Sequence, residues 1–234
     1  MSKEKNVADA LDIDSSLAEE MGDDHVSTSV VTPLRTDAFE LSESEKIEMI
    51  EEQFANIMHT LGLDLNDESL KGTPHRVAKM YVKEIFNGLN PDNKPTARKF
   101  GNKYKYDDMV VVKDINVTSF CEHHFLPFIG KAHVAYISSG NVIGLSKINR
   151  IVDYFARRPQ VQERLTLQIA DEMNDALETE DVAVFIDCKH LCVSTRGIKD
   201  RESSTVTTQY RGKFQTKKAQ QRFIDYIHSN SSEV

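Results

Sequence analysis

The sequence has no long apolar segment, few cysteines and no internal repeat, and each absence narrows its class. No apolar run in the 234 residues is long enough to span a bilayer, and the N-terminus lacks the apolar core of a secretory signal. Its three cysteines, an odd number, argue against a disulfide framework and for a reducing compartment. We therefore expect a cytoplasmic protein that does not contact a membrane.

The net charge of −8 is concentrated near the N-terminus. Residues 1–40 hold ten acidic and three basic residues and so carry −7 of it. The remainder is close to neutral and offers no basic stripe of the kind that nucleic-acid-binding domains carry, so we expect no nucleic-acid partner. Residues 1–42 have few periodic apolar positions, and their composition favours a largely disordered tail over a regulatory or docking arm.

Apolar periodicity predicts an N-terminal helical region over residues 43–108 and a β-rich body over residues 109–234. Apolar positions three and four residues apart predict five helices, near 47–61, 74–88, 146–158, 161–177 and 217–227. β-branched or alternating segments predict four strands, at 109–120, 130–137, 182–187 and 203–210. Ser42 or Ser44 and Thr73 are the expected N-caps, and Ser146 opens the third helix. This order predicts an α+β fold, an antiparallel sheet with helices on one face.

Two segments far apart in the sequence carry the chemistry, Cys121-Glu122-His123-His124 and His190-Leu191-Cys192. Cys121 and His124 are three residues apart, a spacing that lets a thiolate and an imidazole share one ion in a tight turn, and Cys192 would supply a third ligand. Two thiolates and one imidazole suit Zn²⁺, and three protein ligands leave a fourth position for water, as in catalytic sites. His123 and His190 would then be acid/base groups beside that water. The alternative is buried thiols and satisfied core histidines.

Basic residues gather around the same segments. Arg196 follows Cys192 by four residues, Lys147 and Arg150 lie on the helix opened by Ser146, and Arg76 lies on the second helix. Arginine forks suit phosphate oxygens, although surface solubility is the simpler explanation for any single Arg or Lys. For Arg196, four residues past a candidate ligand, we favour an anion contact. Glu163 can accept hydrogen bonds from an edge such as that of guanine, but the residues alone favour an ordinary first-turn glutamate stabilised by the helix dipole.

Three blocks of the sequence resemble the GTP cyclohydrolase I family: SFCEHHFLPFIGKAHVAYI, IGLSKINRIVDYFARRPQVQERLTLQIA and HLCVSTRGI. The resemblance covers roughly residues 43–229. It implies a tunnelling-fold (T-fold) subunit that forms pentameric β-barrels, stacked as a homodecamer with active sites between subunits. It also implies zinc on Cys121, His124 and Cys192, and proton transfer by His123 and His190. The resemblance further implies guanine recognition by Glu163 with Gln162 and Ser146 nearby, and triphosphate contacts from Lys147, Arg150, Arg196 and a neighbouring subunit's copy of Arg76.

The implied reaction converts GTP and water to 7,8-dihydroneopterin triphosphate and formate, the first step of pterin and folate biosynthesis. It comprises attack of activated water on C8 of the purine, protonation of N7 by a histidine, loss of formate, and rearrangement of the opened ribose. No redox cofactor is implied. Two other classes remain possible from the residues: a zinc-stabilised module that only binds a nucleotide or partner, and another zinc hydrolase. A nucleobase deaminase would need H-x-E and P-C-x-x-C, and the chain has neither.

Overall fold

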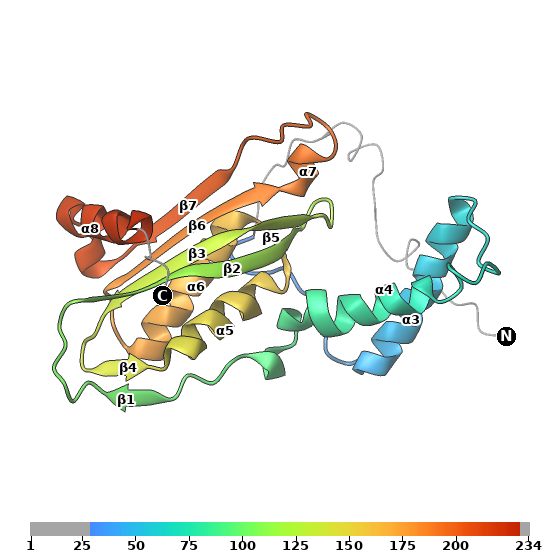
Figure 1. Cartoon of the computed structure of the whole chain (residues 1–234). Coiled ribbons are helices and arrows are strands. Elements are labelled where there is room, and N and C mark those ends of the chain that lie inside the picture. The colour runs from blue at the N-terminus through green and yellow to red at the C-terminus, as the bar shows by residue number, and fades with distance from the viewer. Residues whose placement is uncertain (1–28, 230–234) are drawn as a thin grey trace. The chain divides into compact units, whose positions relative to one another are not determined.

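A five-stranded sheet is the centre of the fold in the computed structural model, which describes residues 29–229 (Figure 1). The strand order is β5-β2-β3-β6-β7. Strands β2 (Met109–Cys121), β3 (Pro127–Ile137), β6 (Val182–His190) and β7 (Thr205–Tyr210) are antiparallel neighbours, and the short β5 (Pro159–Gln160) is parallel to the end of β2. The four predicted strands are therefore present, and they pair as two hairpins joined through β3 and β6.

Two helices cover one face of this sheet, as the sequence predicted. They are α5 (Leu145–Ala156) and α6 (Gln162–Leu177). Their apolar stripes meet the alternate side chains of β2, β3 and β6 in the main core, where Ile148 and Leu165 are fully buried. A smaller cluster on the other face holds the terminal helix α8 (Lys217–His228) through Phe214 and Phe223. Burial of these apolar side chains is what stabilises the layers.

The N-terminal region is a pair of helices. In α3 (Glu43–Thr60), Ser42 is the N-cap of a complete capping box, and the helix stops before Gly62, whose φ is +83°. Then α4 (Thr73–Met80) passes into a π-helical turn, η1 (Tyr81–Ile85), and two 3₁₀ turns, η2 (Asn87–Leu89) and η3 (Pro91–Asn93). The prediction of Thr73 as an N-cap was wrong. Gly72 occupies that position, and the Thr73 hydroxyl instead accepts a hydrogen bond from Arg76.

Other differences from the predicted elements are small and local. Helix α5 begins at Leu145 with Gly144 as N-cap, so Ser146 lies one residue inside the helix that it was expected to open. Strand β6 continues to His190, three residues beyond its predicted end. The sequence did not reveal β1 (Lys99–Gly101), β4 (Asn141–Ile143), β5 or the single-turn α7 (Leu191–Ser194). Elements of two to four residues are too short for a repeat of apolar residues to be recognised in the sequence.

Strand direction gives the sheet two distinct ends. At the first, β2 ends at Cys121 and β6 ends at His190; we call it the Cys121 end. At the second, Met109 pairs with Ile137, and the chain passes through β4 into α5; we call it the Ser146 end. A strand of 13 residues separates them, about 40 Å at 3.3 Å per residue.

Strands β3 and β6 approach each other closely at Gly130, near the Cys121 end. A Cβ atom at position 130 would lie 1.9 Å from the carbonyl oxygen of Asp187 and 2.7 Å from Cys188 Sγ. Only glycine leaves room for this contact.

The described residues bear on two further expectations. Residues 1–28 and 230–234 lie outside them, so the acidic tail predicted over 1–42 is described only from residue 29. Among the helices within residues 29–229, none combines the length and apolar character needed to cross a membrane.

Candidate metal centre

The structure brings Cys121, His124 and Cys192 together at the Cys121 end of the sheet. One ligand atom from each residue lies within 4.8 Å of the other two. Cys121 is the last residue of β2, His124 lies on the turn that leads to β3, and Cys192 lies in α7, immediately after β6. The turn is tight because the Phe125 N–H donates to the Cys121 carbonyl at 2.8 Å, and the Cys121 N–H donates to the Leu126 carbonyl at 2.9 Å. Two hairpins thus present the three donors to one point.

The donor set fits a thiophilic divalent cation. Burial raises the pKa of Cys192, and the neighbouring Cys121 thiol raises it further. The Cys192 thiol therefore keeps its proton unless a cation compensates the charge of the thiolate, and binding of such a cation releases that proton. Within residues 29–229 no fourth histidine, cysteine, aspartate or glutamate joins the group. Three protein donors are typical of catalytic metal sites, whereas structural sites are closed by four.

His123 lies in the turn of residues 122–126 between β2 and β3, which we call the metal turn, and both of its ring nitrogens have a polar neighbour. Its Nδ1 atom is 3.6 Å from Cys121 Sγ, and its Nε2 atom is 3.7 Å from a carboxylate oxygen of Glu122. Glu122 in turn forms a forked ion pair with Arg164 of α6, in which Nη2 donates to Oε1 at 3.1 Å. The Arg164 side chain is only 2% exposed. This buried pair therefore ties the metal turn to the first turn of α6.

His190, the last residue of β6, is fixed on two sides. Its ring stacks on the buried Phe128, with ring centroids 4.6 Å apart and planes inclined by 8°. Its Nε2 atom is 2.8 Å from the Gln162 side-chain oxygen. Burial lowers the pKa of His190, and the negative charge of Glu163 partly offsets that effect. The His190 ring is thus held in one orientation two residues before the Cys192 donor.

Arg196 also reaches the donor group. Its Nη1 atom lies 2.6 Å from His124 Nε2, which places a guanidinium beside the predicted metal ligands. Gln162 and Glu163 are the first two residues of α6, and Gln162 is 1% exposed. Six of the predicted residues therefore gather around or within the donor group: Cys121, His123, His124, His190, Cys192 and Arg196. Gln162 is linked to them through His190.

Four predicted residues lie elsewhere in the chain. Ser146, Lys147 and Arg150 are in the first half of α5, at the Ser146 end of the sheet, where Ser146 and Arg150 are exposed. Arg76 is in α4, and its guanidinium donates to the Ser69 carbonyl at 3.3 Å and to the Thr73 hydroxyl at 2.8 Å. One chain by itself therefore does not gather all of the predicted site residues.

Sequence reasoning missed Glu122, Arg164 and Phe128 as neighbours of the donor group. Glu122 stands inside the C-E-H-H motif, so a charged residue within that turn was the only available signal. The partners of Glu122 and His190 come from α6 and β3, and these approach only through the tertiary fold.

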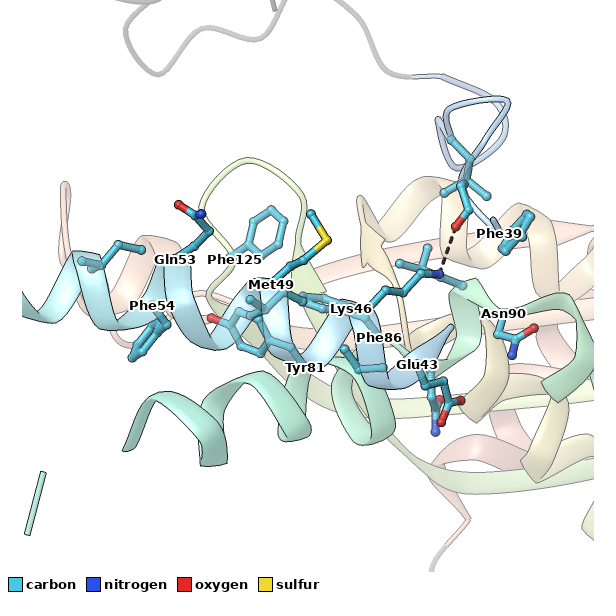
Figure 2. A pocket seen from close by; sticks show the side chains of 17 residues that line it. Phe39, Glu43, Lys46, Met49, Gln53, Phe54, Tyr81, Phe86, Asn90 and Phe125 are labelled. Carbon is cyan, nitrogen blue, oxygen red and sulfur yellow. Dashed lines mark hydrogen bonds between the residues drawn. The ribbon is translucent and has the colours of Figure 1, made fainter. Parts of the chain in front are cut away.

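An apolar groove adjoins the metal turn on the side of the helical region (Figure 2). Its volume is about 580 Å³, and α3, η1 and the chain before α3 provide most of its walls. Phe125 of the metal turn also lines it and contacts Phe86 edge to face at 5.3 Å. Phe86 makes a similar contact with Phe120, at 5.6 Å. The helical region is thus packed directly onto the turn that carries His123 and His124.

Comparison with known proteins gives close matches over most of the chain. The profile of the family described as GTP cyclohydrolase I matches residues 50–228. The GTP cyclohydrolase 1 of Flavobacterium johnsoniae is 62% identical over 209 residues, 89% of this chain and 94% of the relative. The corresponding protein of Aeromonas salmonicida is 55% identical, covering 79% of this chain and 84% of the relative. That of Citrobacter koseri is 50% identical, covering 88% and 93%.

Proposed function

Because this chain belongs to the GTP cyclohydrolase I family, we propose that it converts GTP and water to 7,8-dihydroneopterin triphosphate and formate. This is the first step of pterin and folate biosynthesis. The fold is the α+β tunnelling fold of that family, whose members depend on a metal. The observation that carries the proposal is the convergence of Cys121, His124 and Cys192, from two hairpins, with donor atoms within 4.8 Å of one another.

Zinc is the metal that we propose for this centre. Two thiolate sulfurs and one imidazole nitrogen are a common zinc ligand set, and the three-donor count leaves one position open. A zinc ion bound there supplies Lewis acidity, which lowers the pKa of water toward about 7. The three free cysteines support a reducing location for the enzyme, and we propose the cytoplasm.

The residues around the donor group supply binding and proton transfer. Glu163 would accept hydrogen bonds from the N–H edge of guanine, and Arg196 would bind a phosphate oxygen through its planar fork. His123 and His190 would exchange protons with the purine and the opened ribose, one of them protonating N7 so that the imidazole ring can open. Their fixed rings, one beside Glu122 and one on Phe128, support such roles because a proton donor must keep its orientation.

An active site between subunits, in a homodecamer, would complete this arrangement. Ser146, Lys147 and Arg150 have the polar and basic character expected of substrate contacts, yet they lie at the Ser146 end of the same chain's sheet. In a ring of subunits the Ser146 end of one chain can face the Cys121 end of the next. Arg76 would likewise act on a neighbouring subunit's substrate.

The test is turnover of GTP by the purified, zinc-loaded protein. We expect formate and the pterin product, the latter measured by fluorescence, to form in equal amounts. In the variant His123→Ala we expect turnover to collapse while zinc content and assembly are retained. A fully metallated oligomer that leaves GTP intact would refute the proposed function. Unchanged nucleotide binding without turnover would instead favour a binding module.

A further inference from the structure

Gln162 has every polar atom of its side chain engaged. Its amide nitrogen, which carries two hydrogens, has three acceptors within reach: the carbonyl oxygens of Thr205 at 2.8 Å and Ile186 at 3.2 Å, and the Thr207 hydroxyl at 3.1 Å. Its amide oxygen faces His190 Nε2 at 2.8 Å. The residue is 1% exposed, so a substrate has no access to a free donor or acceptor on it. The side chain is built into the junction of α6, β6 and β7.

These contacts fix the direction of the amide. A side-chain amide can in principle be turned so that its oxygen and nitrogen exchange places. Here, two of the partners are backbone carbonyl oxygens, which can only accept hydrogen bonds. The NH₂ group must therefore face Ile186 and Thr205, and the amide oxygen must face His190.

The direction of the amide in turn fixes the proton on His190. Because the Gln162 oxygen can only accept, His190 Nε2 must carry the hydrogen, and the neutral ring is the Nε2–H tautomer. The parallel stack on Phe128 keeps the ring in one plane. Within residues 29–229 the structure shows no hydrogen-bond partner for His190 Nδ1, which leaves that nitrogen as the ring's open acceptor.

We propose that Gln162 is a positioning residue that holds His190 as the Nε2–H tautomer and so confines its proton transfer to Nδ1. The consequence for the reaction rests on the proposed function; the hydrogen-bond arrangement does not. In its neutral form, His190 can therefore accept a proton only at Nδ1. When Nδ1 takes a proton from a substrate hydroxyl or water, an N–H bond forms, the O–H bond breaks, and its electron pair stays on oxygen. The imidazolium keeps its Nε2–H bond to Gln162, and Nδ1 later returns the proton that it took.

The chain offers a matched control for this proposal, because Gln160 is a second buried glutamine two residues away. Gln160 is 0% exposed, and its amide donates to the Phe155 carbonyl and to the Gln168 side-chain oxygen, neither of which belongs to a histidine. We expect Gln162→Met to lower kcat about 10- to 100-fold with little change in KM, the range typical for loss of an orienting partner. Gln160→Met removes an equally buried amide and should leave kcat within about twofold of wild type.

A double substitution separates positioning from direct action. In the His190→Ala background, Gln162→Met should cause no further loss of kcat, because Gln162 would act only through His190. Independent, additive losses would overturn the proposal, and so would equal losses in the two single glutamine variants.

Nitrogen NMR tests the tautomer without any turnover. In the zinc-loaded wild type at pH 8, correlation of labelled ring nitrogens with ring carbons should show hydrogen on His190 Nε2, the signal being identified by its loss in His190→Ala. Hydrogen on Nδ1 would overturn the proposal even if Gln162→Met fails to fold. If the wild type does not turn over GTP, the proposed function fails, and this measurement still decides what Gln162 does.

Discussion

The two ends of the sheet differ in how their polar residues are held. At the Cys121 end, functional groups are braced by buried partners from other elements, as Glu122 is by Arg164 and His190 is by Gln162. At the Ser146 end, the predicted substrate contacts on α5 are largely exposed, and the ion pair of Lys99 with Glu178 is open to solvent. The difference suggests a division of labour. The rigid end would perform the chemistry, and the exposed end would complete a neighbouring subunit's site.

The most severe test of this comparison removes one donor from the Cys121 end. We expect Cys192→Ala to lose bound zinc and at least about 1,000-fold in kcat, because Lewis acidity supplies several kcal/mol of transition-state stabilisation. Metal analysis and the pterin assay measure both. Cys188→Ala, four residues away in the core, is the control and should retain zinc. Full metal content in Cys192→Ala would contradict the assignment of Cys192 as a ligand.

Subunit mixing tests whether the two ends cooperate between chains. His123→Ala disables the Cys121 end and Lys147→Ala disables the Ser146 end, and we expect each protein alone to be nearly inactive. In a randomly mixed oligomer, about a quarter of the sites would pair two intact ends, so co-expression should restore about a quarter of wild-type activity. Activity no higher than that of either parent would show that both ends serve the same chain's site.

The ion pairs at the two ends should differ in their effect on stability. Arg164→Met leaves Glu122 without its buried partner, and we expect a loss of about 3–5 kcal/mol in the free energy of unfolding. The double variant Glu122→Gln/Arg164→Met should recover part of it. Lys99→Met, at the Ser146 end, breaks a pair whose side chains are 38% and 61% exposed and should change the melting temperature far less. Equal shifts in calorimetry would remove the contrast between buried and exposed pairs.

The smallest effect near neutral pH concerns Cys188, which lies at the Cys121 end but faces the core. Burial raises the pKa of this thiol to about 12, above its ordinary value. A group with a raised pKa contributes stability in full below its unfolded pKa, about 8.5, and loses that contribution as the pH rises through the folded pKa. Below pH 8.5 the unfolding free energies of wild type and Cys188→Ala should therefore run parallel with pH. Above it, wild type should fall more steeply; parallel curves up to pH 12 would contradict this.

Much of the fold could be predicted from local sequence patterns, because in a long helix or strand the spacing of apolar residues shows which face is buried. The strand ending at Cys121 and the stripe of α6 are such elements. Short pieces were not foreseen: β1 and β4 have three residues each, and the irregular pairing between Val112 and Ile115 leaves no compositional trace. The N-cap of α3 was predicted correctly because the Ser42 side chain itself makes the capping hydrogen bond. The N-cap of α4 was missed because Gly72 occupies that position without any side-chain hydrogen bond.

The donor group was predictable for a similar reason. Cys121 and His124 are close in sequence, and the chemistry of the two segments pointed to Cys192. The bracing residues were not predictable, because Arg164 meets Glu122, and Gln162 meets His190, only when α6 docks across the ends of β2 and β6. The spacing of residues in the sequence does not predict how α6 packs against these strand ends.

Gly130 extends the vulnerability of the enzyme beyond the residues that touch substrate. Because Gly130 has no side chain, β3 and β6 can run in close contact at this point. The contact lies near the turn of His124, which precedes β3, and near the turn of Cys192, which follows β6. Even one methyl group there would wedge the two hairpins apart and spread the sulfurs and the imidazole beyond the grasp of a single ion. An inherited or engineered alanine at position 130 would thus appear in an assay as a defect in metal loading, although position 130 lies within a strand and contributes no ligand.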